Sequence, residues 1–244
     1  MKNETKKPSL IHLSNINKGF VTSAGTFEAL KDINLTVNKG EFISVIGKSG
    51  SGKTTLMNLI AGIDKPTSGE ILVEEKVIHT MSENQISKWR GVNVGVVFQF
   101  FQLLPTLSVI ENVMLPMDFG KTFRKSIRKE RALYLLKQVG IEDQAYKYPS
   151  ALSGGEQQRT AIARALANDP SIILADEPTG NLDTATADDV FRIFNALVQS
   201  GKTVIIVTHD QDIAARCSRT IKLADGRIVQ KEESICSVPD GVNC

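Results

Sequence analysis

The segment GKSGSGKT at residues 47–54 limits the possible folds of this chain more than any other feature. It matches G-x-x-x-x-G-K-[ST] and lies between an apolar run, FISVIG, and a helical pattern, TTLMNLIAG, that stops at Gly62. This context predicts a buried strand, a loop and a helix, with backbone N–H groups facing phosphate oxygens. A structural turn would explain the glycines but not the Lys-Thr pair, because Lys53 supplies charge to the phosphates and Thr54 a hydroxyl ligand for Mg²⁺. The predicted phosphate contacts are Gly47, Ser49, Gly50, Ser51, Gly52, Lys53, Thr54 and Thr55.

Two later apolar runs repeat the strand pattern. SIILAD at 171–176 and TVIIVTH at 203–209 have the composition of buried strands. The helical pattern between them, at 185–201, carries its apolar residues on one face and closes at Gly201. Strand, helix and strand in succession predict an α/β fold with a mainly parallel sheet, whose ligands gather at the carboxyl ends of the strands.

Two other parts of the chain have different patterns. Residues 10–20 and 27–37 alternate apolar and polar residues around a turn near 22–25, which predicts an antiparallel β part. Residues 100–150 are helical in pattern and predict a lobe inserted in the α/β core. We expect one domain over 1–244, with a core of about 10–99 and 151–229, a lobe of about 100–150 that continues into the next helix, and a tail at 230–244.

Polar side chains follow the buried strands. Asp176 ends a strand and suits a Mg²⁺ ligand, and Glu177 follows it as a group to orient or deprotonate an attacking water, unless it only caps the loop. His209 is expected to bind the γ-phosphate, the alternative being a satisfied polar residue at a strand end. Gln99, between core and lobe, is an amide that can bind Mg²⁺ or the attacking water. The predicted catalytic side chains are Lys53, Gln99, Glu177 and His209, and the predicted Mg²⁺ ligands are Thr54, Gln99 and Asp176.

A second glycine-rich turn, LSGGEQQR at 152–159, opens an alanine-rich helix. Ser153 and Glu156 fit a capping box, so a well-capped helix is one explanation. Capping does not call for Gly154 and Gly155, whereas close approach of a phosphate does. Because the chain is long enough for only one nucleotide-binding module, this turn is predicted to serve a nucleotide bound by a second subunit.

Together these motifs resemble those of ATP-binding cassette proteins. LSGGEQQR is similar to the signature motif, and it lies between a Walker A loop, GKSGSGKT, and a Walker B strand, IILADE, followed by NLD at 181–183 and His209. The resemblance spans residues 10–229 and implies a P-loop NTPase core. It also implies a head-to-tail dimer of two copies around ATP and Mg²⁺. The residues it assigns are Ser153, Gly154 and Gly155 to the partner's γ-phosphate, Asp183 to the dimer interface, Gln99 to the Q-loop, and Phe20, with Phe27 as a weaker candidate, to the adenine base.

Residues outside the nucleotide-binding motifs narrow the resemblance to one group within the family. FQFFQLLPTLSVIENVMLP together with LADEPTGNLD is most similar to the cassettes of macrolide exporters and lipoprotein-releasing systems. In such systems ATP drives a separate membrane permease. The apolar stretch 100–117 is expected either to receive a helix of that permease or to belong to the core, with Met114, Leu115 and Met117 the residues in question.

Composition agrees with this reading. The start, MKNETKKPSL, has no apolar stretch behind its lysines, and the sequence contains no membrane-length apolar run. We therefore expect a cytoplasmic protein held at the inner face of the membrane by its permease. Cys217, Cys236 and Cys244 show no metal-ligand spacing and are expected to be free thiols.

Two other classes of protein share part of this set of motifs. The first is a soluble cassette ATPase that acts on nucleic acid or ribosomes; such proteins usually join two cassettes in one chain or separate their motifs by long coiled coils, and this chain has neither feature. The net charge of +2 neither demands nor excludes nucleic acid. The basic run 121–131 includes Glu130 and is expected to be a solvated helix face, so no nucleic acid is expected. A phosphotransferase would also use a Walker A loop, but it gives no reason for LSGGEQQR.

Overall fold

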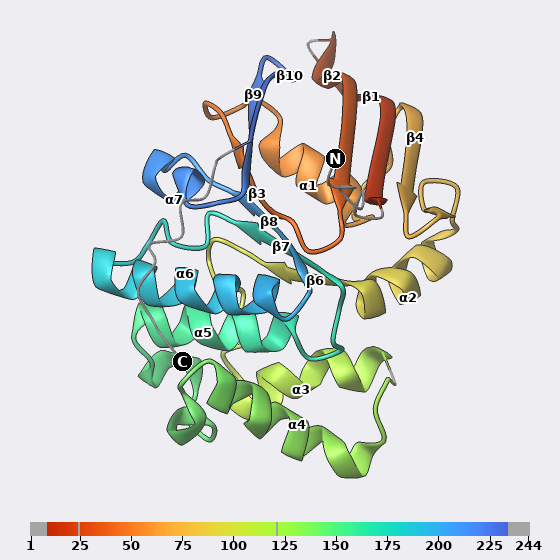
Figure 1. The fold of residues 1–244 in the computed structure, drawn as a ribbon. Helices are drawn as coiled ribbons and strands as arrows, with labels where there is room; N and C mark the ends of the chain where they lie inside the picture. The colour runs from red at the N-terminus through yellow and green to blue at the C-terminus, as the bar shows by residue number, and fades with distance from the viewer. Residues whose placement is uncertain (1–8, 24, 121, 234–244) are drawn as a thin grey trace, which may run out of the picture.

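The computed structural model describes residues 9–23, 25–120 and 122–233. Their ribbon has an antiparallel sheet at one end, a larger sheet in the middle and a group of helices at the other end (Figure 1). The α/β expectation is confirmed. Cys236, Cys244 and most of the predicted tail lie outside the described residues.

The antiparallel sheet is formed by the two segments that the alternating pattern identified and by two short strands that it did not. Its order is β2-β1-β4-β5, and β1 and β2 pair from the Ser9↔Asn38 end to Thr22↔Gly25, at the predicted turn. Alternate residues such as Leu13 and Ile33 are buried, which is why each strand alternates in polarity. The bounds are β1 Ser9–Thr22, β2 Gly25–Asn38, β4 Ser68–Val73 and β5 Lys76–Val77.

The larger sheet contains the three predicted buried strands. Its order is β10-β9-β3-β8-β7-β6, and the pairs from β9 to β6 are parallel, whereas β10 pairs with β9 antiparallel. The parallel strands end at one edge, where Ile46, Asp176 and Val207 are the last residues of β3, β7 and β8. The bounds are β3 Phe42–Ile46, β6 Val94–Val97, β7 Ile172–Asp176, β8 Thr203–Val207, β9 Arg219–Ala224 and β10 Arg227–Glu233.

Both faces of this sheet are covered, so its strands read as continuous apolar runs. Ile172, Leu174 and Ile205 face a core shared with the antiparallel sheet and α1. Ile173 and Ile206 face a second core, shared with α3, α4, α5 and α6. The bounds of the helices are α1 Lys53–Ile60, α2 Glu83–Asn93, α3 Val109–Gly120, α4 Lys125–Gln138, α5 Gly154–Ala165, α6 Thr184–Gln199 and α7 Gln211–Ala215, with short 3₁₀ turns at Glu142–Gln144 and Pro149–Ala151.

The helical part packs on the second core through its apolar faces. Met117 is buried at 0% exposure, which settles that residue as core, whereas Met114 and Leu115 are only partly buried. Arg131 of α4 donates to the carbonyls of Leu166 and Ala167, which joins α4 to the end of α5. Within the described residues, no helix has both the length and the apolar character needed to cross a membrane.

Candidate nucleotide site

The predicted phosphate loop connects β3 to α1. Gly52 is the N-cap of α1 and has a left-handed backbone, φ 102°, and a Cβ there would lie 2.6 Å from the Ala29 carbonyl oxygen, so the position requires glycine. The Lys53 ammonium reaches back across the loop and donates to the carbonyls of Gly47, at 2.7 Å, and Lys48, at 3.1 Å. Incoming phosphate oxygens are stronger acceptors for this ammonium than those carbonyls.

A pocket of about 570 Å³ opens beside this loop and brings most of the predicted site residues together. This volume falls in the usual range for a small-molecule site. Gly47 and Ser51 do not line it, and Ser51 is buried at 5% exposure. The lining residues are Phe20, Phe27, Ala29, Ser49, Gly50, Gly52, Lys53, Thr54, Thr55, Gln99, Asp176, Glu177 and His209.

The three predicted Mg²⁺ ligands all line this pocket. The Thr54 hydroxyl donates to Asp176 Oδ2 at 3.1 Å, which brings a hydroxyl oxygen and a carboxylate together. Burial raises the pKa of the Asp176 carboxyl, and the hydrogen bond from Thr54 partly offsets this. Hydroxyl, amide and carboxylate oxygens are the donors that Mg²⁺ prefers, so these side chains fit the ion. Among the described residues no group of three or more His, Cys, Asp or Glu side chains is arranged to hold a metal ion by itself, and this set contains one carboxylate.

Glu177 and His209 are in direct contact, which sequence reasoning did not foresee. His209 Nδ1 lies 2.8 Å from Glu177 Oε1, and the Thr208 hydroxyl lies 3.4 Å from Oε2. The Glu177 side chain is 14% exposed and His209 is 73% exposed. Glu177 also has a left-handed backbone, φ 46°, and its N–H donates to Val207 O. The carboxylate is thus fixed at the pocket wall, next to an imidazole that solvent or ligand can reach.

Phe20 and Phe27 form an aromatic pair at the outer end of the pocket. They are direct partners in the β1–β2 pairing, so their side chains lie on the same face of the sheet. They are 40% and 55% exposed. The Lys18 ammonium lies 4.8 Å from the centre of the Phe20 ring. Lys18 thus lies over one side of the Phe20 ring, and Phe27 is placed as well as Phe20 to stack on a flat ligand group.

The turn at residues 152–155, which we call the signature turn, has the capping box that the sequence predicted. Ser153 caps α5 with a full capping box: its Oγ accepts from Glu156 N, and Glu156 Oε2 accepts from Ser153 N at 2.8 Å. These bonds to Ser153 hold the pKa of Glu156 below its ordinary value. Among the described residues that line the 570 Å³ pocket, none comes from this turn. The turn does not serve the chain's own pocket.

The two glycines of the turn have different reasons for being glycine. A Cβ at Gly155 would lie 2.4 Å from Thr186 Cγ2 of α6, so this glycine is required by packing within the chain. A Cβ at Gly154 would be 3.7 Å from Leu182 Cδ2, an ordinary contact, and Gly154 is exposed. Only Gly154 leaves an open surface that nothing inside the chain explains.

Asp183 is the N-cap of α6. Its carboxylate accepts from Thr186 N at 3.0 Å and from the Thr186 hydroxyl at 2.6 Å, and these bonds lower the pKa of Asp183. Capping therefore accounts for Asp183 within one chain, and its predicted place at a dimer interface stays a prediction. Through Thr186 and Leu182, this loop packs beside the signature turn.

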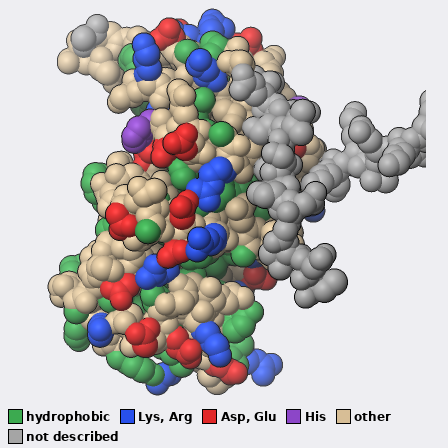
Figure 2. Space-filling view, turned by 60° about the vertical axis from the view of Figure 1, so that its left-hand side comes forward, with side chains coloured by type: hydrophobic (Ala, Val, Ile, Leu, Met, Phe, Trp, Pro, Cys, Tyr) green, Lys and Arg blue, Asp and Glu red, His purple; other side chains and the backbone are tan. Residues whose placement is uncertain are grey.

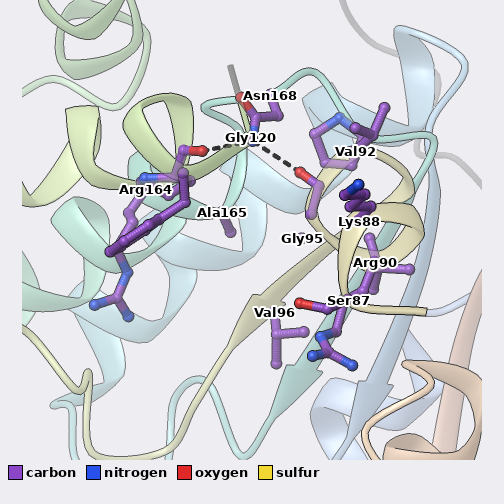
Figure 3. Close-up of a pocket in the computed structure, with 15 residues that line it drawn as sticks. Ser87, Lys88, Arg90, Val92, Gly95, Val96, Gly120, Arg164, Ala165 and Asn168 are labelled. Carbon is purple, nitrogen blue, oxygen red and sulfur yellow. Dashed lines mark hydrogen bonds between the residues drawn. The ribbon is translucent and has the colours of Figure 1, made fainter. Parts of the chain in front are cut away.

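A second cavity, of about 770 Å³, lies between α2, α3, β6 and the end of α5 (Figure 3). We call it the α2–α3 groove. Asn168 Nδ2 joins its walls by donating to Gly91 O of α2 and Pro116 O of α3. The stretch expected either to receive a permease helix or to belong to the core, 100–117, ends before Phe119 of α3, which is 79% exposed. The groove is lined by Ser87, Lys88, Arg90, Gly91, Val92, Val94, Gly95, Val96, Pro116, Phe119, Gly120, Arg164, Ala165, Asn168 and Pro170.

The basic run is only partly the solvated face that we expected. Lys125 and Lys129 are exposed, but Arg128 is 6% exposed and donates to Phe123 O and Asp118. Buried arginines that hold the helical part together are unavailable to phosphates. On the face in Figure 2, Lys and Arg side chains are interspersed with Asp and Glu and form no continuous basic area. Cys217, which the sequence predicts to be a free thiol, is a free cysteine and is buried.

Comparison with protein families matches residues 30–180 to a model described as ABC transporter. The chain is 46% identical to the lipoprotein-releasing system ATP-binding protein LolD of Aquifex aeolicus, over 83% of this chain and 90% of that protein. It is 41% identical to the macrolide export ATP-binding/permease protein MacB of Pectobacterium atrosepticum, over 96% of this chain and 37% of that protein.

Among solved structures, the chain resembles the cassette MJ0796 of Methanocaldococcus jannaschii. The match is to a dimeric post-hydrolysis state bound to ADP and Pi. It has a TM-score of 0.86 and 41% identity, and it covers 92% of this chain and 98% of that one.

Proposed function

The chain belongs to the ABC transporter family of ATP-binding, ATP-hydrolysing subunits, and from this premise we propose a specific working arrangement. Two copies bind two ATP molecules between them and drive a separate membrane permease of the type that exports or releases its substrate from a membrane. The similarity to LolD and MacB supports this transporter type. The similarity to a dimeric cassette supports the arrangement of the copies.

One observation carries the proposal. Gly154 is open to solvent at the N-terminus of a capped helix, yet it lies outside the chain's own pocket. A helix N-terminus with free N–H groups favours an anion. An ATP molecule held by a second copy supplies that anion, and the same relation holds in reverse, as a two-fold dimer requires.

In each pocket we assign roles by what the side chains can reach. Lys53 and the loop N–H groups bind the phosphates, and Phe20 and Phe27 stack on the base. Bound Mg²⁺, held by Thr54, Asp176 and Gln99, would neutralise charge on the phosphate oxygens. Glu177 takes a proton from the water that attacks the γ-phosphorus, and His209 holds this carboxylate in place and contacts the γ-phosphate. The products are ADP and phosphate.

The α2–α3 groove is assigned to the permease. Its lining combines exposed apolar side chains, Val92 and Phe119, with the exposed ammonium of Lys88, and no acidic side chain of the described residues lines it. This suits a short amphipathic helix that carries a carboxylate. Docking there holds the chain at the cytoplasmic face of the membrane.

The test is the oligomeric state of an inactive variant. Glu177→Gln keeps the shape of the side chain but removes the base, so ATP and Mg²⁺ should convert the 26.7 kDa monomer into a stable dimer on light scattering. ADP should leave it monomeric. A Glu177→Gln protein that binds ATP and stays monomeric would refute the arrangement.

The docking site has its own test. Phe119→Cys, crosslinked in cells with a bifunctional thiol reagent, should give an adduct with a protein of several membrane spans. The matched control is Val21→Cys, which is 90% exposed at the far end of β1. Equal crosslinking of both variants would contradict docking in the groove.

A further inference from the structure

The chain makes an unfavourable turn directly after Gln99. Phe101 and Gln102 both have left-handed backbones, φ 57° and φ 50°. L-residues other than glycine adopt this conformation at a cost in free energy, and two in succession are uncommon. The Phe101 side chain packs against the second core, so the turn is anchored on its inner side. Its backbone forms two short-range hydrogen bonds, from Phe101 N–H to Phe98 O at 3.2 Å and from Gln102 N–H to Phe100 O, and the carbonyls of both left-handed residues need partners from another element.

Arg164 supplies that support from the last turn of α5. Its Nη2 donates to Phe101 O at 2.6 Å and its Nη1 to Gln102 O at 2.5 Å, so one guanidinium holds the carbonyls of both left-handed residues. Burial lowers the pKa of Arg164, because the charge has been partly removed from water. The planar fork of arginine fits two adjacent carbonyls in a way that lysine does not.

The two ends of α5 therefore face two different places. Its first residue, Gly154, belongs to the turn that we assign to the partner's ATP, and Arg164 lies ten residues further on, about 15 Å along the helix. Gln99, two residues before Phe101, lines the chain's own pocket. Its carbonyl also accepts from Asn181 Nδ2 at 3.2 Å, in the loop that precedes α6.

We propose that Arg164 is a positioning residue that ties Gln99 to α5, so that contact between Gly154 and the partner's ATP changes the position of Gln99 in the chain's own pocket. This inference rests on the proposed dimer. It assigns the communication between two sites about 15 Å apart to one rigid helix and a pair of hydrogen bonds at its end. The two Arg164 hydrogen bonds and the left-handed turn form one structural element. The partner's ATP acts on it through α5, and the chain's own ATP acts on it through Gln99.

The experiment uses amide hydrogen exchange in the Glu177→Gln chain, with and without ATP. ATP should slow exchange of residues 98–104 in the parent, because closing the dimer fixes the turn. With Arg164→Ala added, the dimer should still form and the protection at 98–104 should be lost. In the active chain, Arg164→Ala should lower kcat about tenfold and leave ATP affinity of the monomer unchanged, a coupling typical of connected networks. Arg192→Ala, in an exposed ion pair on α6, is the control arginine.

A second substitution distinguishes two roles of Arg164, the link between α5 and Gln99 and the stabilisation of the left-handed turn. Glycine adopts the left-handed conformation freely, so Gln102→Gly lets the turn form without Arg164. Arg164→Ala should also destabilise the chain, because it removes both bonds to the turn. If Arg164 ties α5 to Gln99, Arg164→Ala/Gln102→Gly should restore this stability but neither the ATP-dependent protection nor kcat. Recovery of either, or protection that survives Arg164→Ala alone, overturns the inference. A Glu177→Gln parent that never dimerises refutes the dimer and this inference together.

Discussion

Gly155→Ala tests whether the signature turn is locked to α6. The added Cβ would lie 2.4 Å from Thr186 Cγ2, more than 1 Å inside an ordinary carbon contact of about 3.5 Å. Thr186 cannot turn its methyl away, because its hydroxyl and its N–H are both bonded to Asp183. One part of the helix must shift.

The expected cost follows from these contacts. Overpacking costs about 1–3 kcal/mol. Alanine offsets about 0.5–1 kcal/mol of this cost, because it loses less backbone conformational entropy on folding than glycine does. The midpoints of these two ranges give a net loss of about 1.3 kcal/mol, or about 3–5 °C in Tm for a domain of this size. Thr186→Ser keeps the hydroxyl on Asp183 and removes the clashing methyl.

The assay is urea unfolding of the nucleotide-free monomer for the parent, both single variants and the double variant. Gly155→Ala/Thr186→Ser should recover about 1 kcal/mol or more of the loss, a coupling that distant residues do not show. Gly154→Ala is the matched control and should be at least as stable as the parent, by up to about 1 kcal/mol, since its Cβ meets no close neighbour and alanine loses less backbone entropy on folding than glycine does. A Gly155→Ala chain as stable as the parent, or additive effects in the double variant, would refute the packing argument.

Four further outcomes are expected. Glu177→Gln should lower ATP turnover at least about 100-fold in a phosphate-release assay, as loss of a general base does, and parental turnover would remove Glu177 from the mechanism. Gly154→Asp should abolish ATP-dependent dimers on light scattering but leave monomer ATP affinity unchanged; a parallel loss of affinity would place the turn in the chain's own site. Asp176→Asn should raise Tm without nucleotide at pH 7.5, because the raised pKa means that the ionised form destabilises the folded chain; the gain should shrink as pH falls and vanish below the ordinary value of 3.8, and a gain independent of pH would contradict this. Phe119→Asp should leave basal ATPase activity intact and remove the membrane-protein crosslink of a second groove residue, Val92→Cys; an unchanged crosslink would exclude Phe119 from docking.

Sequence patterns were informative where one segment carries a complete signal. The phosphate loop predicted β3 and α1, and the apolar runs predicted β7 and β8 with Asp176 and His209 at or just beyond their ends. Strands β4, β5, β6, β9 and β10 were not identified. Strand β4 lies between β1 and β5, and only Ile71 and Val73 are buried in it, which leaves no clear period.

Features that depend on contacts between distant segments were beyond such reasoning. The α2–α3 groove is built from separate stretches of chain, and the Glu177–His209 contact joins the ends of two strands. Arg164 has no motif of its own and acquires meaning only through the carbonyls that it holds. Gly155 shows the same limit, since the sequence suggested only a ligand as the reason for this glycine and the close approach of Thr186 adds a second reason.

The amide of Asn168 gives the α2–α3 groove a mechanical property. It is 7% exposed, and its Nδ2 reaches Gly91 O at 2.7 Å and Pro116 O at 3.0 Å, one on each wall. Both bonds are partly buried, so separating the walls breaks two hydrogen bonds, each of which contributes about 0.5–1.5 kcal/mol. We therefore expect the Asn168 amide to resist small separations of α2 and α3, so that the two walls of the groove move together.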